Sequence, residues 1–185
     1  MAQSKILLDS NSYFRLAKSI HPLLDVVFGE RDYCLYVLKE LDEEYDNNRG
    51  LRKKFDWVNS DEYYQNRQKQ LSVSKAHRKE IDLTIEYLWQ YKIANQLGIS
   101  SVDIKCLAYG FVLQIPVTTD DIDMLDVAGE FEISTMKTLE LMALMYKCGH
   151  ITMKKITEIA AYWEYIGDKP AGFRDDFEKL FGEKL

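Results

Sequence analysis

Hydrophobic positions along the chain fall into short runs and into longer stripes with helical spacing. Short apolar runs over 5–9, 33–37 and 115–119 are bounded by turn-forming residues, which is the pattern of buried strands. A last strand is expected over 131–134. Helical spacing predicts helices over these ranges: 12–28 with a break at His21–Pro22, 37–48, 51–97 with a break near Asn59–Ser60, from Ser100 or Ser101 onward, 120–128, 139–148, 152–166 and 173–181.

The alternation of strands and helices predicts the fold class. Strands separated by helices are typical of parallel sheets with helical crossovers. We therefore expect an α/β protein with three layers, α/β/α, around a small parallel sheet. The main domain is expected to span 1–150 and to contain a helix-rich insert at about 49–97. A helical C-terminal extension over 151–185 is expected to pack on the same domain.

Composition is that of a globular protein without a membrane span. Hydrophobic residues make up 46% of the chain and charged residues 29%. The longest stretch without charge, 106–119, has 14 residues, which is too short to cross a bilayer, and the N-terminus lacks a signal-peptide pattern. Cys34, Cys106 and Cys148 form no CxxC pair, so a reducing cytoplasm is the expected location.

Charge is distributed unevenly along the chain. The net charge is −6, but the segment 49–80 carries +5 and the remainder carries −11. This basic segment also contains Trp57, Tyr63 and Tyr64. It is either a solvated helical face or a nucleic-acid contact, in which cations neutralise phosphates and aromatic rings stack on bases. The candidate RNA contacts are Arg52, Lys53, Lys54, Arg67 and Lys69.

Carboxylates follow two of the predicted strands and open a helix before the second. Asp9 ends the first strand, Asp103 lies in the first turn of a helix, and Asp120, Asp121 and Asp123 follow the run at 115–119. Each alone is explained as a helix cap or a first-turn residue. Because neighbouring parallel strands end at one edge, roughly 5 Å apart, the acids are also expected to converge. Mg²⁺ and Mn²⁺ prefer such oxygen ligands, and a bound cation would neutralise the closely spaced charges.

Other site chemistries find little support in the sequence. His21, His77 and His150 have neither HxxxH nor HExxH spacing, which argues against zinc. The chain contains no GxxxxGK[ST], GxGxxG or GxSxG motif. The three cysteines lie in apolar patterns and are interpreted as core residues. An acid-rich site for a hard cation is therefore the favoured chemistry.

Four short motifs together resemble the PIN-domain nucleases, in particular the bacterial toxin-type members. These motifs are LLDSN at 7–11, VLKEL at 37–41, SVDIKCLAYG at 101–110 and VTTDDIDML at 117–125. They occur in the order that the family has, and the resemblance covers roughly residues 5–150. The stretch 49–97 is long compared with compact members of the family.

The resemblance implies a set of site residues. Asp9, Glu40, Asp103 and Asp120 fall on the family's catalytic acids, and Asp9, Asp103, Asp120 and Asp123 on its Mg²⁺ or Mn²⁺ ligands, with Asp121 a weaker candidate. Asn11, Thr118 and Thr119 fall in supporting positions. Glu43 and Glu44 lie three and four residues after Glu40, so either is an alternative on the same helix face.

The implied function is metal-dependent endonucleolytic cleavage of single-stranded RNA. The family also implies a toxin–antitoxin role, with an antitoxin protein as a partner and a homodimer as a further expectation. Two alternatives stay open at this point. One is a PIN-like binding or scaffold module without turnover, in which the acids are only caps and surface charge. The other is a phosphatase or structure-specific DNase that uses the same acids.

Overall fold

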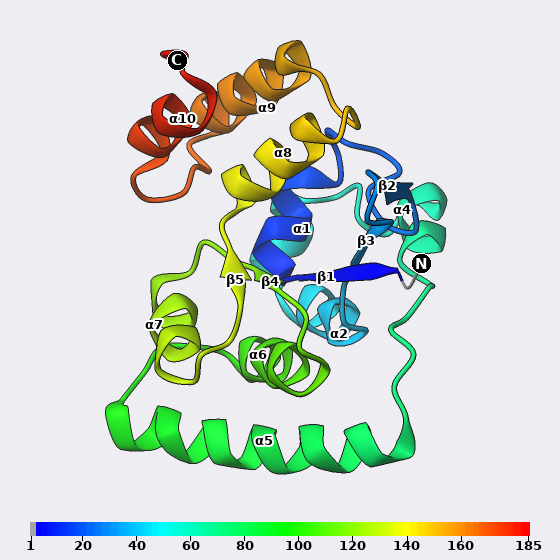
Figure 1. Ribbon diagram of the computed structural model, residues 1–185, viewed down its shortest axis with the longest axis vertical. Helices are drawn as coiled ribbons and strands as arrows, with labels where there is room; N and C mark the ends of the chain where they lie inside the picture. Colours follow the sequence, from blue (N-terminus) through cyan, green and yellow to red (C-terminus); the bar gives the residue numbers. More distant parts are fainter. Residues whose placement is uncertain (1–2) are drawn as a thin grey trace.

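The centre of the protein is a five-stranded sheet. The computed structural model describes residues 3–185, which form five strands and ten helices (Figure 1). The strands lie in the order β2-β3-β1-β4-β5, and all neighbours are parallel except β2 and β3. Their bounds are Ser4–Leu8 for β1, Val27–Phe28 for β2, Tyr33–Tyr36 for β3, Val117–Thr118 for β4 and Thr135–Met136 for β5.

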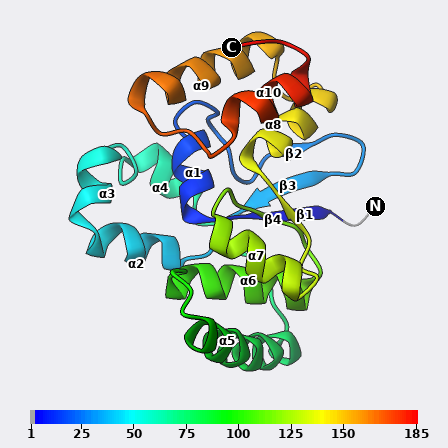
Figure 2. The same ribbon diagram turned by 90° about the vertical axis from the view of Figure 1, so that its left-hand side faces the viewer.

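Helices cover both faces of this sheet. Their bounds are Ser10–Leu16 for α1, Glu40–Asn47 for α2, Arg49–Lys54 for α3, Asp61–Asn66 for α4, Lys75–Asn95 for α5, Ser101–Leu113 for α6, Ile122–Glu130 for α7, Thr138–Lys147 for α8, Met153–Ile166 for α9 and Phe173–Phe181 for α10. Helices α1 and α8 lie on one side, and α6 and α7 on the other (Figures 1 and 2). The architecture is therefore the three-layer α/β/α arrangement expected from the sequence.

Strand alternation divides the hydrophobic core in two. Ile6 and Leu8 of β1 point into the core under α1 and α8, whereas Leu7 points into the core under α6 and α7. Trp163 of α9 and Phe177 of α10 belong to the first of these cores. The C-terminal helices are thus part of the packing that supports β1.

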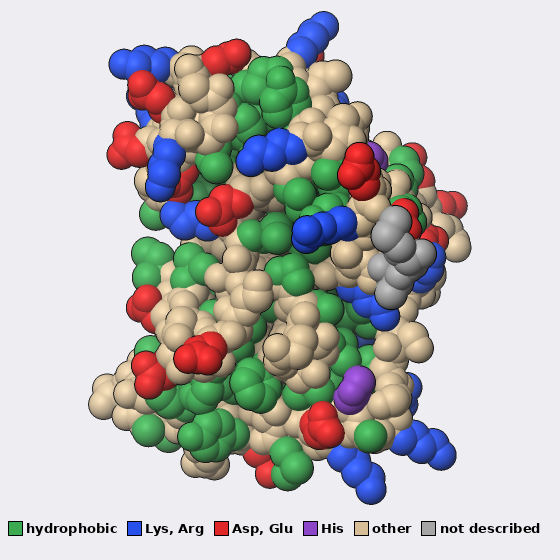
Figure 3. Space-filling model, in the orientation of Figure 1, with side chains coloured by type: hydrophobic (Ala, Val, Ile, Leu, Met, Phe, Trp, Pro, Cys, Tyr) green, Lys and Arg blue, Asp and Glu red, His purple; other side chains and the backbone are tan. Residues whose placement is uncertain are grey.

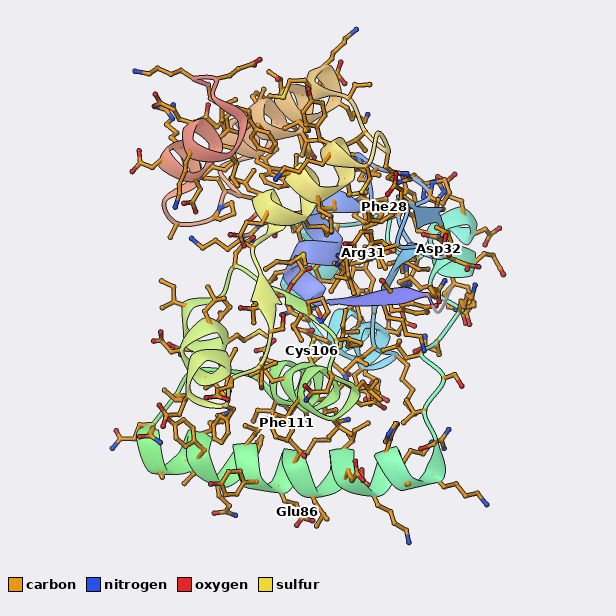
Figure 4. All side chains as sticks on the ribbon, in the orientation of Figure 1. Phe28, Arg31, Asp32, Glu86, Cys106 and Phe111 are labelled. Carbon is orange, nitrogen blue, oxygen red and sulfur yellow. The ribbon has the colours of Figure 1, made fainter. Side chains whose placement is uncertain are left out.

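The insert at 49–97 is less helical than its sequence pattern predicts. It contains α3, α4 and α5, but residues 68–74 between α4 and α5 lack regular structure. Helix α5 packs along α6 and forms an outer wall on that side of the sheet (Figure 2). Phe111 of α6 points toward α5, whereas Glu86 points away from the protein (Figure 4).

Three local predictions from the sequence are wrong. The predicted strand at 131–134 is a turn and a loop, and β5 begins only at Thr135. Phe131 packs edge-on against Tyr87 and Tyr91 of α5, and Glu132 has a left-handed φ of 54°, so the chain turns here instead of extending. The predicted helix at 12–28 ends at Leu16, and turns lead from there to β2. In addition, α2 begins at Glu40 and not at Val37.

None of the helices in the described chain has both the length and the apolar character that a bilayer crossing requires.

Candidate functional site

The sheet places β1 at its centre, so Asp9 occupies a special position. The chain continues from β1 to β3 on one side and later to β4 on the other, which makes the carboxyl end of β1 a topological switch point. Ligands of open α/β sheets bind in the crevice at such points. Asp9 is the first residue after β1, and its backbone N–H donates to the carbonyl oxygen of Thr118 at 3.0 Å.

Asp9 is buried, and hydrogen bonds compensate only in part for the loss of water around its carboxylate. Its side chain is the N-cap of α1, where Oδ1 accepts a hydrogen bond from the backbone of Ser12 at 2.6 Å. Burial is the main cause that raises the pKa of Asp9 from 3.8 to about 6, and the nearby Asp120 adds to it. Hydrogen bonds from Ser12 and Thr119 oppose this shift. Ionised Asp9 is therefore an energetically unfavourable group that an opposite charge would stabilise.

Asp103 faces the same small cleft as Asp9. It lies in the first turn of α6, where Oδ2 accepts from the backbone N–H of Ser100 at 2.7 Å in a capping box. The cleft is lined by Asp9, Ser10, Asp103, Cys106 and neighbouring apolar residues. Cys106 points from α6 toward the sheet (Figure 4), and burial raises the pKa of its thiol well above 9.0, so it is a neutral wall residue.

Glu44, and not Glu40, is the residue of α2 that approaches this cleft. The hydroxyl of Ser10 donates to Glu44 Oε2 at 2.5 Å. Burial raises the pKa of Glu44, and the charge of Asp103 contributes to the shift. Glu40 lies one turn earlier on the same helix face, where Lys105 Nζ is 3.1 Å from its Oε1, and Glu43 is exposed.

Asp120 has an internal cation as its partner. Arg15 Nη1 lies 2.9 Å from Asp120 Oδ2, and both side chains are largely buried, with exposed fractions of 15% and 5%. The backbone N–H of Thr138 donates to Asp120 Oδ1 at 3.0 Å, and the Thr138 hydroxyl donates to Oδ2. Arg15 also contacts Asp168, just beyond α9, at 3.4 Å. The structure therefore compensates Asp120 without any added ion.

The two acids after Asp120 have structural partners of their own. Asp121 is the N-cap of α7 and accepts from the backbone of Met124 at 2.9 Å. Asp123 Oδ2 accepts from the backbone N–H of Gly98 at 2.8 Å and so ties α7 to the loop after α5. Asp120, Asp121 and Asp123 line an outer cleft of about 370 Å³. This cleft is distinct from the one between Asp9 and Asp103.

The three supporting residues differ in their surroundings. Asn11 is exposed and lines the outer cleft with Arg15. Thr119 is buried, and its hydroxyl accepts from the backbone of Asp121 at 3.1 Å. Thr118 is also buried, and within the described part of the chain its Oγ1 is one of two buried side-chain polar atoms without a hydrogen-bond partner, the other being Arg15 Nε.

Of the five residues predicted to contact RNA, Arg67 is buried, and its prediction is wrong. Only 1% of Arg67 is exposed, because its guanidinium is held inside the insert by Asp42 at 2.8 Å and by the carbonyl oxygen of Val58 at 2.6 Å. Its positive charge stabilises the fold and does not reach a ligand at the surface. Arg52, Lys53, Lys54 and Lys69 are exposed, but Lys54 pairs with Asp168 and Lys69 with Asp25.

The site thus consists of two acids that line one cleft and two neighbouring acids. Asp9 and Asp103 share a cleft, Glu44 is hydrogen-bonded to Ser10 at its edge, and Asp120 is held next to it by Arg15. Within residues 3–185, no three His, Cys, Asp or Glu side chains converge closely enough to hold a metal ion by themselves. Sequence reasoning missed Ser10, Arg15 and Thr138, since each acts through a partner far away along the chain.

Comparison with known proteins adds no identification. No protein-family model matches the chain, and no curated protein matches it.

Proposed function

We propose that the protein is a metal-dependent ribonuclease that hydrolyses phosphodiester bonds of single-stranded RNA. The observation that carries the proposal is the cleft shared by Asp9 and Asp103 at the carboxyl end of the central parallel strand. Burial raises the pKa of Asp9 to about 6, and the carboxylates of Glu44 and Asp120 lie nearby. The resemblance of the four acidic motifs to PIN-domain nucleases supports the same assignment.

The donor atoms of this cleft suit Mg²⁺ or Mn²⁺. Asp9 and Asp103 offer carboxylate oxygens, which hard cations prefer as ligands. Mg²⁺ commonly takes only one or two protein carboxylates and completes its shell with water and phosphate. Asp9 and Asp103 would hold the ion, with Glu44 beside them. When bound, the ion would supply a water of lowered pKa and would neutralise charge that develops on the phosphate.

The protein's own residues fix the carboxylates in place. The backbone of Ser12 holds Oδ1 of Asp9, and the side chains of Ser12 and Thr119 also hydrogen-bond to this carboxylate. The backbone of Ser100 holds Oδ2 of Asp103. Arg15 pairs with Asp120 and places a guanidinium beside the site, where it can also attract a phosphate.

Two ion pairs favour an alternative function. Asp120 is already neutralised by Arg15, and Glu40 by Lys105, so two of the four expected catalytic acids have protein partners. This arrangement suits a PIN-like module that binds a partner without turnover. The toxin role, the antitoxin and the homodimer rest on the family resemblance alone and stay predictions.

The test is a cleavage assay with a panel of substrates. Wild-type protein is incubated with single-stranded RNA, single-stranded DNA, duplex DNA and a phosphomonoester, each with Mn²⁺ or with a chelator. We expect Mn²⁺-dependent cleavage of RNA that Asp103→Asn abolishes and that Asp126→Asn, an exposed acid on α7, leaves unchanged. Absence of cleavage in the wild type, with Mn²⁺ binding intact, would instead support the module without turnover.

A further inference from the structure

A second cleft lies directly beside the acidic one. It has a volume of about 380 Å³ and is enclosed by the start of α2, the segment 70–73, the first half of α5 and one side of α6. Leu38 lines both clefts, so they are neighbours. The insert supplies one whole wall of this cleft. A volume of this size lies in the range of ligand pockets.

The second cleft is locally positive although the protein is acidic. Its charged lining residues are the cations Lys39, Arg78 and Lys105 and the acids Glu40 and Asp82, which give a local charge of +1. Lys105 pairs with Glu40 at 3.1 Å but keeps 34% of its side chain exposed. Lys39 and Arg78 are exposed. Basic side chains gather at this N-terminal end of α5 (Figure 3). The cleft is therefore suited to one phosphodiester charge.

The floor of the second cleft is apolar and includes an aromatic ring. Leu71 and Val73 come from the irregular segment before α5, Ile85 from α5 itself, and Tyr109 from α6. An aromatic side chain beside cations is the combination by which proteins hold single strands, since bases stack on the ring while the backbone contacts the positive charges. A purely ionic site would not need this floor.

Helix α6 connects the two clefts. Val102, Asp103 and Cys106 line the acidic cleft, whereas Lys105 and Tyr109, one turn apart on the adjacent stripe of the helix, line the second cleft. Lys105 and Tyr109 therefore follow Asp103 along α6, at the border where Leu38 lines both clefts.

We propose that this second cleft binds a nucleotide of single-stranded RNA adjacent to the bond that is cleaved, with Lys39, Arg78 and Lys105 on its phosphate and Tyr109 against its base. The identification of the ligand as RNA rests on the proposed ribonuclease function. The proposal differs from the sequence-based expectation, because the proposed contacts lie on α2, α5 and α6, whereas the expected cations were Arg52, Lys53, Lys54, Arg67 and Lys69.

Fluorescence anisotropy of a short fluorescein-labelled single-stranded RNA tests the cleft. Binding is measured in chelator, so that turnover plays no part. The variant Lys39→Gln/Arg78→Gln removes two cations from the cleft, and Lys154→Gln/Lys179→Gln removes two exposed cations from the C-terminal helices as the matched control. We expect the cleft variant to bind about tenfold more weakly. Its slope of log K against log salt should also fall by about 1.4, which is about 0.7 for each lost contact with a single strand.

Three results would overturn the proposal. One is equal affinity of the cleft variant and the wild type. Another is that the wild type does not bind RNA at all. The third is that a free nucleoside monophosphate binds as tightly as the RNA and with the same dependence on Lys39 and Arg78, since the ligand would then be a mononucleotide and not a strand.

A photo-crosslink on the wild type gives a second, independent measurement. RNA that carries 4-thiouridine should crosslink to peptides containing Leu71–Val73 or Tyr109, and crosslinks confined to α3 would contradict the proposal. Cleavage is scored separately with Mn²⁺. RNA binding through this cleft without cleavage would overturn the proposed nuclease function only, whereas cleavage with an unaffected cleft variant would overturn this inference only.

Discussion

The guanidinium of Arg15 lies 2.9 Å from the carboxylate of Asp120, and both side chains are almost buried. This pair explains how the three closely spaced acids after β4 are tolerated. Asp120 has an internal cation, while Asp121 caps α7 and Asp123 binds the backbone of Gly98. A metal ion is therefore not needed to neutralise the acids of this segment. The cleft of Asp9 and Asp103 is the better place for the ion that the sequence predicts.

Removal of Arg15 should destabilise the protein strongly. Arg15→Met leaves the carboxylate of Asp120 buried beside Asp9 without its cation, and breaking a pair of this kind costs about 3 kcal/mol. Urea unfolding at neutral pH measures the loss. Arg174→Met, which removes an exposed arginine paired with Glu164, is the matched control and should change the stability far less. Equal effects of the two substitutions would contradict the buried role of Arg15.

Asp9 should make the stability depend on pH. Its pKa is raised from 3.8 to about 6 in the folded protein, so the native state binds more protons than the unfolded state between these values. The contribution of Asp9 to the stability of the protein is therefore greatest below about pH 4. It falls by about 3 kcal/mol in total as the pH rises through 6. Asp9→Asn keeps an N-cap acceptor but cannot ionise.

Urea unfolding of wild type and Asp9→Asn in chelator, at several pH values from about 4 to 7, measures this effect. We expect the free energy of unfolding of the variant to exceed that of the wild type by an increasing amount as the pH rises. A difference that does not change with pH would show that Asp9 titrates normally.

The acid of α2 that supports the metal should be Glu44. Glu44→Gln is expected to weaken Mn²⁺ binding, because Glu44 lies next to Ser10 and Asp103. Glu40→Gln should leave Mn²⁺ affinity nearly unchanged, since Glu40 pairs with Lys105 in the neighbouring cleft. Isothermal titration with Mn²⁺ compares the two variants. A larger loss for Glu40→Gln would restore the assignment that the sequence motif implies.

Arg67 should act on stability and not on RNA binding. Arg67→Met leaves Asp42 without its cation and the carbonyl of Val58 without its donor, so we expect a loss of about 3 kcal/mol in urea unfolding. Lys53→Met, at an exposed position in the same insert, should cost less than about 0.5 kcal/mol. A stable Arg67→Met protein with weakened RNA binding would contradict this assignment.

The sequence predicts those features of the fold and site that depend on local patterns. The apolar runs that become β1, β3 and β4 have turn formers or acids at their ends, and Asp9 and Asp103 lie at the cap positions that their neighbours indicate. Parallel topology then brings these two acids together. Glu44 could be named only as an alternative, because one helical turn separates it from Glu40 and no local pattern chooses between them.

Pairings between distant residues could not be predicted. Arg15 and Asp120 are 105 residues apart, and Arg67 and Asp42 are 25 apart, so nothing in the surrounding sequence marks either arginine as buried. The loop at 131–134 was missed for the same reason, since Phe131 is fixed by rings on α5. Charge counts along the segment 49–80 therefore overstated the positive surface available to RNA.

The most direct test of the central claim is a Mn²⁺ titration followed by melting temperature, on wild type and Asp103→Asn. Binding at a hundredfold excess over Kd adds about 2.7 kcal/mol, which for a chain of this length raises Tm by roughly 5 to 10 °C. We predict this rise in the wild type and its loss in Asp103→Asn, whose side chain still accepts the capping hydrogen bond from Ser100. An unchanged Tm in the wild type, or an equal rise in both proteins, would contradict a metal site at Asp9 and Asp103.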